Sequence, residues 1–350
     1  MNQGNRIGIK SSGAPFRGAF FISFLIKNKY IGEIMNASSD FPTIAVVGHF
    51  SKDEIISAEG SIKIAIGGTA YNLSALSSIM KRGRIIPVCR IGYDIRAEAE
   101  EMFKCWHGID SSGVLRTRYP NVIHRLTYSP DGQRVEWNSG KQSPLPLGNL
   151  CRNTDAILLN FISGSDVRLA ELQTFKKTYK GLIYCDYHSL SLGYSKDQLR
   201  YHRRHPRWRE YLSAIDMVQM NINELGTILG YKPDGLLRVK EACRMLHDLG
   251  PKVINITMGK NGVIVSRKRP SAVWHIPAIK IGQEVDPTGC GDTFAGVFLH
   301  ELLQSNDLIK AALIANRFAA VKATFSGLDG FNDIDRKVNQ IRDRTRPILL

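Results

Sequence analysis

Short apolar runs alternate with segments of helical periodicity from about residue 43 onward. Seven runs predict buried strands, at residues 44–48, 85–88, 156–159, 182–185, 217–220, 253–256 and 263–265. Helical spacing between and after them is clearest at residues 69–80, 95–106 and 311–323. This order predicts an α/β fold with a doubly wound, mostly parallel central sheet flanked by helices, which binds ligands at the carboxyl ends of its strands.

Two stretches, about 54–66 and 114–135, depart from this alternation and predict short β-strands joined by turns. We expect a small β-sheet, drawn from about 50–66 and 112–137, to cover one edge of the site as a lid. A lid excludes water from a reaction that water would otherwise intercept. Residues 41–340 then form one domain, and residues 341–350 form a C-terminal tail.

The first 40 residues differ from the rest because they are basic and contain no acidic residue before Glu33. Their apolar run, residues 18–26, is too short to span a bilayer, which takes about 20 residues. We expect residues 1–40 to be a poorly ordered extension or a mis-assigned start, with Met35 as an alternative first residue. A targeting element is the other interpretation. No other segment is apolar enough for a membrane, and the cytoplasm is the expected location.

The composition and net charge indicate which kinds of partner the protein can bind. The six cysteines form no C-x-x-C pair and no metal-spaced cluster, so reduced thiols are expected. The net charge of +15 favours anionic partners, including phosphorylated small molecules. Residues 200–209 form the densest basic run and interleave arginines with aromatics, as in a nucleic-acid patch. A solvated helix broken at Pro206 is favoured, because no nucleic-acid fold motif accompanies the run.

Residues 286–296 form a glycine-rich turn that leads into an apolar helix and read Asp-Pro-Thr-Gly-Cys-Gly-Asp-Thr-Phe-Ala-Gly. The first N–H groups of a helix have no intrahelical partner and carry positive partial charge, so such a turn can receive an anion. Asp292 would lie beside that anion and could accept a proton from a hydroxyl. Taken alone, Asp292 fits an N-cap at least as well. Cys290 is interpreted as a small filler residue, with a reactive thiolate as the alternative.

Five further elements accompany this turn in a fixed order. They are Asp53, Gly67-Gly68-Thr69-Ala70-Tyr71-Asn72, Gly92-Tyr93-Asp94, Asn221-Ile222-Asn223-Glu224 and Thr257-Met258-Gly259-Lys260-Asn261-Gly262. In order and spacing the set resembles the ribokinase (PfkB) family of carbohydrate and nucleoside kinases, from about residue 43 to about residue 330. The resemblance implies a ribokinase-like fold and transfer of the γ-phosphoryl group of ATP to a hydroxyl of a sugar or nucleoside.

The resemblance also implies roles for single residues at the acceptor end. Asp292 resembles the catalytic base, and the backbone of Gly289, Cys290 and Gly291 resembles the anion hole. Substrate hydroxyls are expected to bind the side chains of Asp53 and Asn72, in a pocket shaped by Gly67 and Gly68.

At the donor end, Asn221 is expected near the nucleotide phosphates, and Glu224 is expected to organise water around Mg²⁺. The resemblance places Thr257 and Gly259 in the nucleotide-binding region and Asn316 near the adenine. Asp286 and Thr288 resemble positions that bind a monovalent cation in some members, so K⁺ is an open question. ADP as donor is not excluded.

Some residues depart from the family pattern or allow two interpretations. Asp186-Tyr187-His188 stands where many members carry Asp-x-Asn, and an ordinary loop histidine is favoured over a pocket residue. Asp94 is expected to satisfy loop amides. Tyr71 could stack on a ring or pack on a helix face. Arg125 and Lys141, in or near the lid, could bind a phosphorylated acceptor, although surface placement is favoured.

Three functions compete at this stage. A kinase acting on a small molecule leads. A sugar- or nucleic-acid-binding regulator without turnover fits the charge but has no need of Asp292, the anion turn and Asn-x-x-Glu together. A dinucleotide oxidoreductase lacks Gly-x-Gly-x-x-Gly after the first strand. We expect no nucleic-acid partner and no membrane, and a homodimer that pairs through the lid is the expected assembly.

Overall fold

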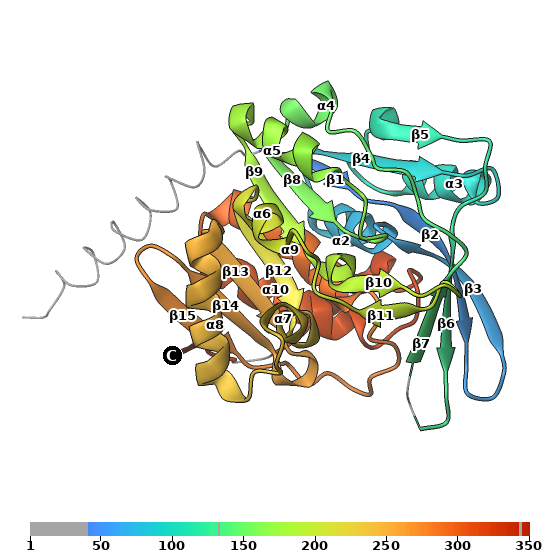
Figure 1. The fold of residues 1–350 in the computed structure, drawn as a ribbon. Helices are drawn as coiled ribbons and strands as arrows, with labels where there is room; N and C mark the ends of the chain where they lie inside the picture. The colour runs from blue at the N-terminus through green and yellow to red at the C-terminus, as the bar shows by residue number, and fades with distance from the viewer. Residues whose placement is uncertain (1–40, 132–133, 343–344) are drawn as a thin grey trace, which may run out of the picture.

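The computed structural model describes residues 41–131, 134–342 and 345–350 (Figure 1). The expectations for residues 1–40 lie outside these ranges. The chain builds a large sheet of ten strands in the order β16-β15-β14-β13-β12-β9-β8-β1-β4-β5, and a four-stranded second sheet projects from one side of it. Within the described ranges, no helix has the length and apolar character needed to cross a membrane.

Seven strands of the large sheet run parallel, as the alternation of strands and helices predicts. They are β1 (Thr43–Val47), β4 (Arg84–Ile91), β5 (Val114–Arg116), β8 (Ala156–Asn160), β9 (Leu182–Asp186), β12 (Met217–Asn221) and β13 (Val253–Thr257). Three antiparallel strands complete the other edge, namely β14 (Val263–Arg267), β15 (Ala272–Ile276) and β16 (Ile348–Leu349). Residues 348–349 of the expected tail thus pair with β15. The doubly wound, mostly parallel sheet is confirmed.

Helices cover both faces of this sheet. On one face lie α2 (Ala70–Ile79), α3 (Arg96–Cys105), α9 (Cys290–Ser305), α10 (Leu308–Lys322) and α11 (Ile334–Asn339). On the other lie α4 (Asn149–Arg152), α5 (Leu169–Thr178), α6 (Trp208–Ser213), α7 (Ile222–Leu229) and α8 (Gly235–Leu249). Strand β1 shows why two layers are needed, because Ile44 and Val46 enter one core while Ala45 and Val47 enter the other.

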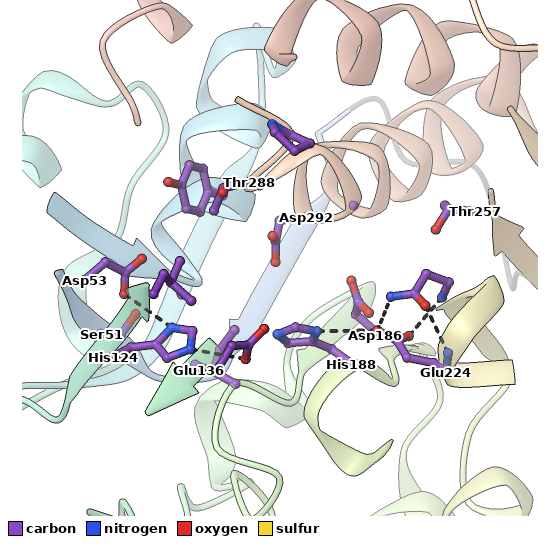
Figure 2. Close-up of a pocket in the computed structure, with 18 of the residues that line it drawn as sticks. Ser51, Asp53, His124, Glu136, Asp186, His188, Glu224, Thr257, Thr288 and Asp292 are labelled. Atoms are coloured by element: carbon purple, nitrogen blue, oxygen red, sulfur yellow. Dashed lines mark hydrogen bonds and ion pairs between the residues drawn. The ribbon is translucent and has the colours of Figure 1, made fainter. Parts of the chain in front are cut away.

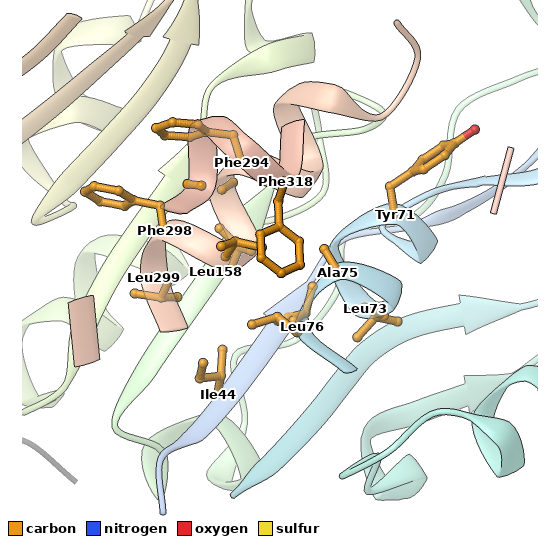
Figure 3. Packing of buried hydrophobic residues seen from close by; sticks show 14 of the residues in the cluster. Ile44, Tyr71, Leu73, Ala75, Leu76, Leu158, Phe294, Phe298, Leu299 and Phe318 are labelled. Atoms are coloured by element: carbon orange, nitrogen blue, oxygen red, sulfur yellow. The ribbon is translucent and has the colours of Figure 1, made fainter. Parts of the chain in front are cut away.

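Helix α9 is the element that fixes the site, and it is held on several sides. Phe294, Phe298 and Leu299 pack into the core shared with α2, α10 and the central strands (Figure 3). The rings of Phe294 and Phe298 stack with centroids 5.6 Å apart. Because this packing continues along α9, the first turn of the helix has little freedom to move.

The second sheet is the lid. Its strands, in the order β3-β2-β6-β7, are β2 (Phe50–Ile56), β3 (Ile62–Gly68), β6 (Ile123–Tyr128) and β7 (Arg134–Asn138). The small sheet expected from the sequence is confirmed, with one correction. Strand β5, inside the stretch expected to supply lid strands, pairs instead with β4 at the edge of the large sheet.

The basic run also differs from the expected helix broken at Pro206. Residues Arg200–His202 form strand β11, which pairs with β10 (Leu192–Tyr194), and the helix α6 begins only at Trp208. The hairpin lies against the lid, since the backbone N–H of Asn138 donates to the carbonyl of Gln198 at 3.2 Å. Arg200 donates to the hydroxyl of Tyr194 at 2.7 Å and lies over its ring. Part of the basic run is therefore engaged in structural contacts.

Candidate active site at the carboxyl edge of the sheet

A cavity of about 230 Å³ lies at the carboxyl ends of the parallel strands, between the large sheet and the lid (Figure 2). Three of its lining residues, Asp186, Asn221 and Thr257, are the last residues of β9, β12 and β13. Strand pairing aligns them, because Asn221 lies opposite Thr257 in the register. The volume is somewhat below the usual range for small-molecule sites, about 300–1,000 Å³. The cavity therefore suits a small molecule.

The turn before α9 closes one side of this cavity. Gly289 has a φ of 80°, in the left-handed region, and precedes the first residue of the helix. A Cβ at this position would collide with the ring of Tyr71. Glycine is therefore required both by the backbone conformation and by the space. Gly289, Gly291 and Asp292 line the cavity, with the side chain of Asp292 near its middle.

Two asparagines hold Asp292 in place. The side-chain amide of Asn160, at the end of β8, donates to Asp292 Oδ1 at 2.5 Å and to Asn72 Oδ1 at 2.7 Å. Asn72 in turn donates to the backbone carbonyl of Asp292 at 2.9 Å. The strand β8, the helix α2 and the helix α9 thus meet at Asp292.

This network changes the interpretation of Asn72. Its side chain is 0% exposed, it does not line the cavity, and both of its amide atoms bond to protein groups. The expectation that Asn72 binds a substrate hydroxyl is not matched by this geometry. Its placement supports a positioning role for Asp292 instead.

The surroundings of Asp292 favour a basic carboxylate. Burial raises its pKa above the ordinary value, while the charge of His188 and the hydrogen bond from Asn160 act in the opposite direction. A carboxylate with a raised pKa is a stronger proton acceptor when ionised. Asp292 therefore has both the place and the electrostatics of a general base.

At the lid side, His124 lies between two acids. Its Nδ1 is 3.7 Å from Asp53 Oδ1, and its Nε2 is 3.4 Å from Glu136 Oε2 (Figure 2). Burial acts to lower the pKa of His124, but its bonds to the two carboxylates outweigh burial and raise the pKa. Ser51 and Tyr71 line the same end, and their buried hydroxyl oxygens have no hydrogen-bond partner among the described residues. This end offers several hydrogen-bonding groups to a polar ligand.

At the opposite end, Asn221 and Glu224 form a capping box at the start of α7. Asn221 Oδ1 accepts from the N–H groups of Asn223 and Glu224, each at 2.9 Å. Glu224 accepts from the N–H of Asn221 at 2.9 Å and from its side-chain amide at 2.5 Å. The box fixes the buried carboxylate of Glu224 toward the cavity.

His188 faces Glu224, with its Nδ1 3.5 Å from Glu224 Oε1. The loop histidine favoured from the sequence is therefore a cavity residue, although its side chain is 41% exposed. Burial would lower the pKa of His188, but the bond and charge of Glu224 and the charges of Asp186 and Asp292 raise it to about 9. A cationic imidazole thus lies among three carboxylates.

Asp186 and Glu224 are the groups that fit Mg²⁺. Among the described residues, no group of three His, Cys, Asp or Glu side chains is arranged to hold a metal ion. Mg²⁺ needs fewer protein ligands than three, because it commonly binds one or two carboxylates together with water and substrate phosphates. Burial and the charges of Asp292 and Glu224 raise the pKa of Asp186 well above its ordinary value. A divalent cation there would relieve that repulsion.

Other expected residues lie outside the cavity lining. Gly67 packs against the carboxylate of Asp53, whereas Gly68 does line the cavity. Gly259 starts a 3₁₀ turn after β13, and Asn316 donates to the carbonyl of Pro277 at 2.9 Å. Burial raises the pKa of Cys290 to about 12, so its thiol stays protonated, as a filler residue would.

The structure also shows the surroundings of the residues for which the sequence allowed two roles. Asp94 accepts from the N–H of Asn121 at 2.8 Å, which confirms a structural role in the loop. Arg125 pairs with Glu54 at 2.6 Å, and Lys141 lies over the ring of Tyr194. Neither cation lines the cavity. Tyr71 packs into the core with α2 and also lines the cavity.

Several site residues were not found from the sequence. They are Ser51, His124, Glu136, Asn160 and Gln219. Gln219 donates to Asp186 at 2.8 Å and to the carbonyl of Gly291 at 2.9 Å, which ties β12 to the turn before α9. The positions of Asn160 at a strand end and of Gln219 near one were the available signals, since such positions meet at one edge of a parallel sheet.

Comparisons with known proteins add evidence on the family. The family model of the pfkB family carbohydrate kinases matches residues 194–334. The cytidine kinase of Thermococcus kodakarensis is 29% identical over 274 residues, 73% of this chain and 87% of that protein. The deoxyribokinase of Salmonella typhi is 25% identical over 280 residues, 76% of this chain and 84% of that protein.

A solved structure supports the same fold. The ribokinase of Arabidopsis thaliana, determined in complex with ribose and ATP, superposes with a TM-score of 0.70 at 19% identity, covering 86% of this chain and 99% of that one. The matched family model, the two similar kinases and the lidded α/β fold agree, and together they point to a kinase of the PfkB (ribokinase) family.

Proposed function

We propose that this kinase transfers the γ-phosphoryl group of ATP to a hydroxyl of an unphosphorylated sugar or nucleoside, with Asp292 as general base. The observation that carries the proposal is the position of Asp292. It stands at the head of α9, beside the Gly289–Gly291 turn and between the two ends of one cavity. A hydroxyl at one end and a triphosphate at the other would meet there.

The chemistry asked of the protein is limited. Phosphoryl transfer needs a positioned hydroxyl, donors aimed at the developing charge and a proton acceptor. Asp292 takes the proton of the hydroxyl, and the Gly289–Gly291 turn faces the transferring phosphate. The N–H of Cys290 donates to the carbonyl of Pro287 at 3.2 Å in this structure. The N–H groups of Gly289 and Gly291 are therefore the proposed donors to the phosphate. Asn160 keeps the Asp292 carboxylate oriented through its bond to Oδ1. The lid then limits access of water.

The charge of the cavity supports an acceptor without phosphate. Asp53, Glu136, Asp186, Glu224 and Asp292 all line it, and the described lining contains no lysine or arginine. A phosphate on the acceptor would meet the carboxylates of Asp53 and Glu136, with the imidazole of His124 between them, rather than a clamp of lysines or arginines. Asp53, His124 and Glu136 suit vicinal hydroxyls or a ring amino group, which free sugars and nucleosides carry. The expected role of Asp53 is thus kept, with His124 and Glu136 added.

The nucleotide is proposed to bind at the end of the cavity that is lined by Asn221, Glu224 and Thr257. Mg²⁺ bound there through Glu224 and Asp186 would neutralise phosphate charge. Gly259 is proposed to flank the nucleotide, and Asn316 to shape the adenine region by holding the carbonyl of Pro277. ATP as the donor is supported by the ribokinase that was solved with ATP.

A panel assay tests the proposal. Purified protein with ATP and Mg²⁺ is mixed with cytidine, other nucleosides, 2-deoxyribose, ribose, and the 5-phosphates of the two sugars, and ADP formation is followed. We expect turnover with at least one unphosphorylated compound and none with its phosphate. Turnover only with phosphorylated acceptors would contradict the assignment of the acceptor class.

His188 is expected to set the acid limb of the pH profile. Its positive charge lowers the pKa of Asp292, so His188→Gln raises that pKa further. The base must be ionised to act, and activity is lost as pH falls through its pKa. The acid limb of kcat/KM should therefore move to higher pH in His188→Gln and move back in His188→Lys, which restores a positive charge. Identical profiles for all three proteins would show that His188 does not tune the base.

The lid supports the proposal of a homodimer. Strand β3 is an outer strand of the lid sheet, and its Ile62 and Ile64 are 66% and 61% exposed. Exposed apolar residues on an edge strand favour pairing with a second copy. We expect light scattering to give a dimer mass for the wild type and a monomer mass for Ile64→Lys. Leu237→Lys, at an exposed site on α8, is the control.

A further inference from the structure

Lys322 is a fully buried lysine behind the turn that precedes α9. It is the last residue of α10, and its side chain is 0% exposed. Its Nζ donates to the backbone carbonyl of Phe325 at 3.1 Å and to that of Asp286 at 3.4 Å. The rings of Phe325 and Tyr71 lie 4.9 and 5.5 Å from the ammonium. Lysine is rarely buried to this extent without partners. Burial lowers the pKa of Lys322, while the charges of Asp286 and Asp292 act to raise it.

The backbone around the ammonium has the character of a cation site. The C-terminus of α10 carries negative partial charge. Beyond it, the carbonyl of Ala323 accepts from the N–H groups of Val285 and Asp286, at 2.7 and 3.2 Å. These bonds bring the segment before the turn against the helix end. Carbonyl oxygens are also the ligands that replace the water shell of K⁺ in proteins.

A separate K⁺ does not fit beside Lys322. Asp286, which was expected to help bind a monovalent cation, already uses its carbonyl oxygen on the lysine. Its Oδ1 accepts from the N–H of Thr288 at 2.9 Å, and its Oδ2 accepts from the hydroxyl of Ser326 at 3.2 Å. A second positive charge at the same oxygens would be repelled by the ammonium. The oxygens of Asp286, which the sequence assigned to a metal ion, thus accept hydrogen bonds from side chains and from a backbone N–H group.

The contacts of Asp286 connect Lys322 to the catalytic turn. Thr288, whose N–H bonds Asp286, directly precedes Gly289. Tyr71 fills the space between them, because its ring contacts both Gly289 and the ammonium. Burial would raise the pKa of Asp286, but the bonds from Thr288 and the charge of Lys322 lower it. Lys322 therefore helps to keep Asp286 ionised and the turn in place.

We infer that the ammonium group of Lys322 takes the place of a monovalent cation behind the anion-binding turn, so that this kinase works without K⁺. The inference rests on the proposed phosphate-binding role of Gly289–Gly291. Lys322 is a positioning residue, since it lies outside the cavity lining and acts through Asp286 and the turn.

Turnover in buffers of defined cations tests the inference. With tetramethylammonium as the only other cation besides Mg²⁺, added K⁺ should change wild-type kcat by less than about twofold, because the site is already filled. Lys322→Ala should lose about 10- to 100-fold without K⁺, the effect of removing a charged hydrogen-bonding group. K⁺ or NH₄⁺ should restore much of the loss. Lys310→Ala, an exposed lysine on the same helix, should match the wild type.

Strong activation of the wild type by K⁺ would overturn the inference, as would a Lys322→Ala protein that no cation rescues. If Lys322→Ala does not fold, the effect of added K⁺ on wild-type turnover tests the inference by itself. Melting temperature supplies a readout without turnover, and K⁺ should raise it in Lys322→Ala and leave it unchanged in the wild type. If no acceptor is phosphorylated, the proposed function fails, whereas the melting data still decide whether Lys322 replaces the ion.

Discussion

Asp292→Asn is expected to lower kcat about 10²- to 10⁴-fold, the usual contribution of a positioned general base. The amide keeps the shape of the carboxylate and an oxygen to accept from Asn160, so the geometry of the first turn of α9 is preserved. What is lost is the ability to take a proton from the acceptor hydroxyl. Binding of the nucleotide should change little, because the backbone of the turn is unaltered.

Stability separates this loss from unfolding. The raised pKa of Asp292 means that the folded protein disfavours its charge, so a neutral amide should not lower the melting temperature. Asp329→Asn, at an exposed site, is the matched control and should keep full activity. Activity near the wild-type level in well-folded Asp292→Asn protein would remove Asp292 from the mechanism.

The fold and part of the site could be predicted from the sequence because their signals are local. Alternating strands and helices predicted the doubly wound sheet, and the short β stretches predicted the lid. Glycine beside an apolar helix predicted the turn before α9, where Gly289 does adopt a positive φ. Each of these features depends on neighbouring residues in the chain.

Other features depend on contacts between distant segments. Asn72 was expected to contact substrate, yet it bonds to Asn160, which is 88 residues away, and to Asp292. His124 is placed by its pairing with Asp53 across the lid, and nothing in its local sequence marks it. Lys322 appears as an ordinary last-turn helix lysine until the segment before α9 folds over it. Tertiary packing decides such roles.

Asp53→Ala is expected to weaken the acceptor end selectively. A carboxylate that accepts two hydroxyl hydrogen bonds contributes about 1.5–3 kcal/mol for each, so kcat/KM for the acceptor should fall about 10²-fold or more. The affinity for nucleotide should be unchanged, because Asp53 lies on the lid side of Asp292, away from Glu224 and Thr257 (Figure 2). Acceptor kinetics and nucleotide titration on the same protein measure the two effects.

The adjacent acid Glu54 provides a matched control for this variant. Glu54 pairs with Arg125 on the lid and does not line the cavity, so Glu54→Gln removes a lid carboxylate without touching the acceptor end. In Asp53→Ala, His124 also loses one of the two partners that raise its pKa, and NMR titration should show that pKa falling. An equal loss of nucleotide affinity would mean that Asp53 supports the whole lid, whereas a loss confined to the acceptor assigns Asp53 to its hydroxyls.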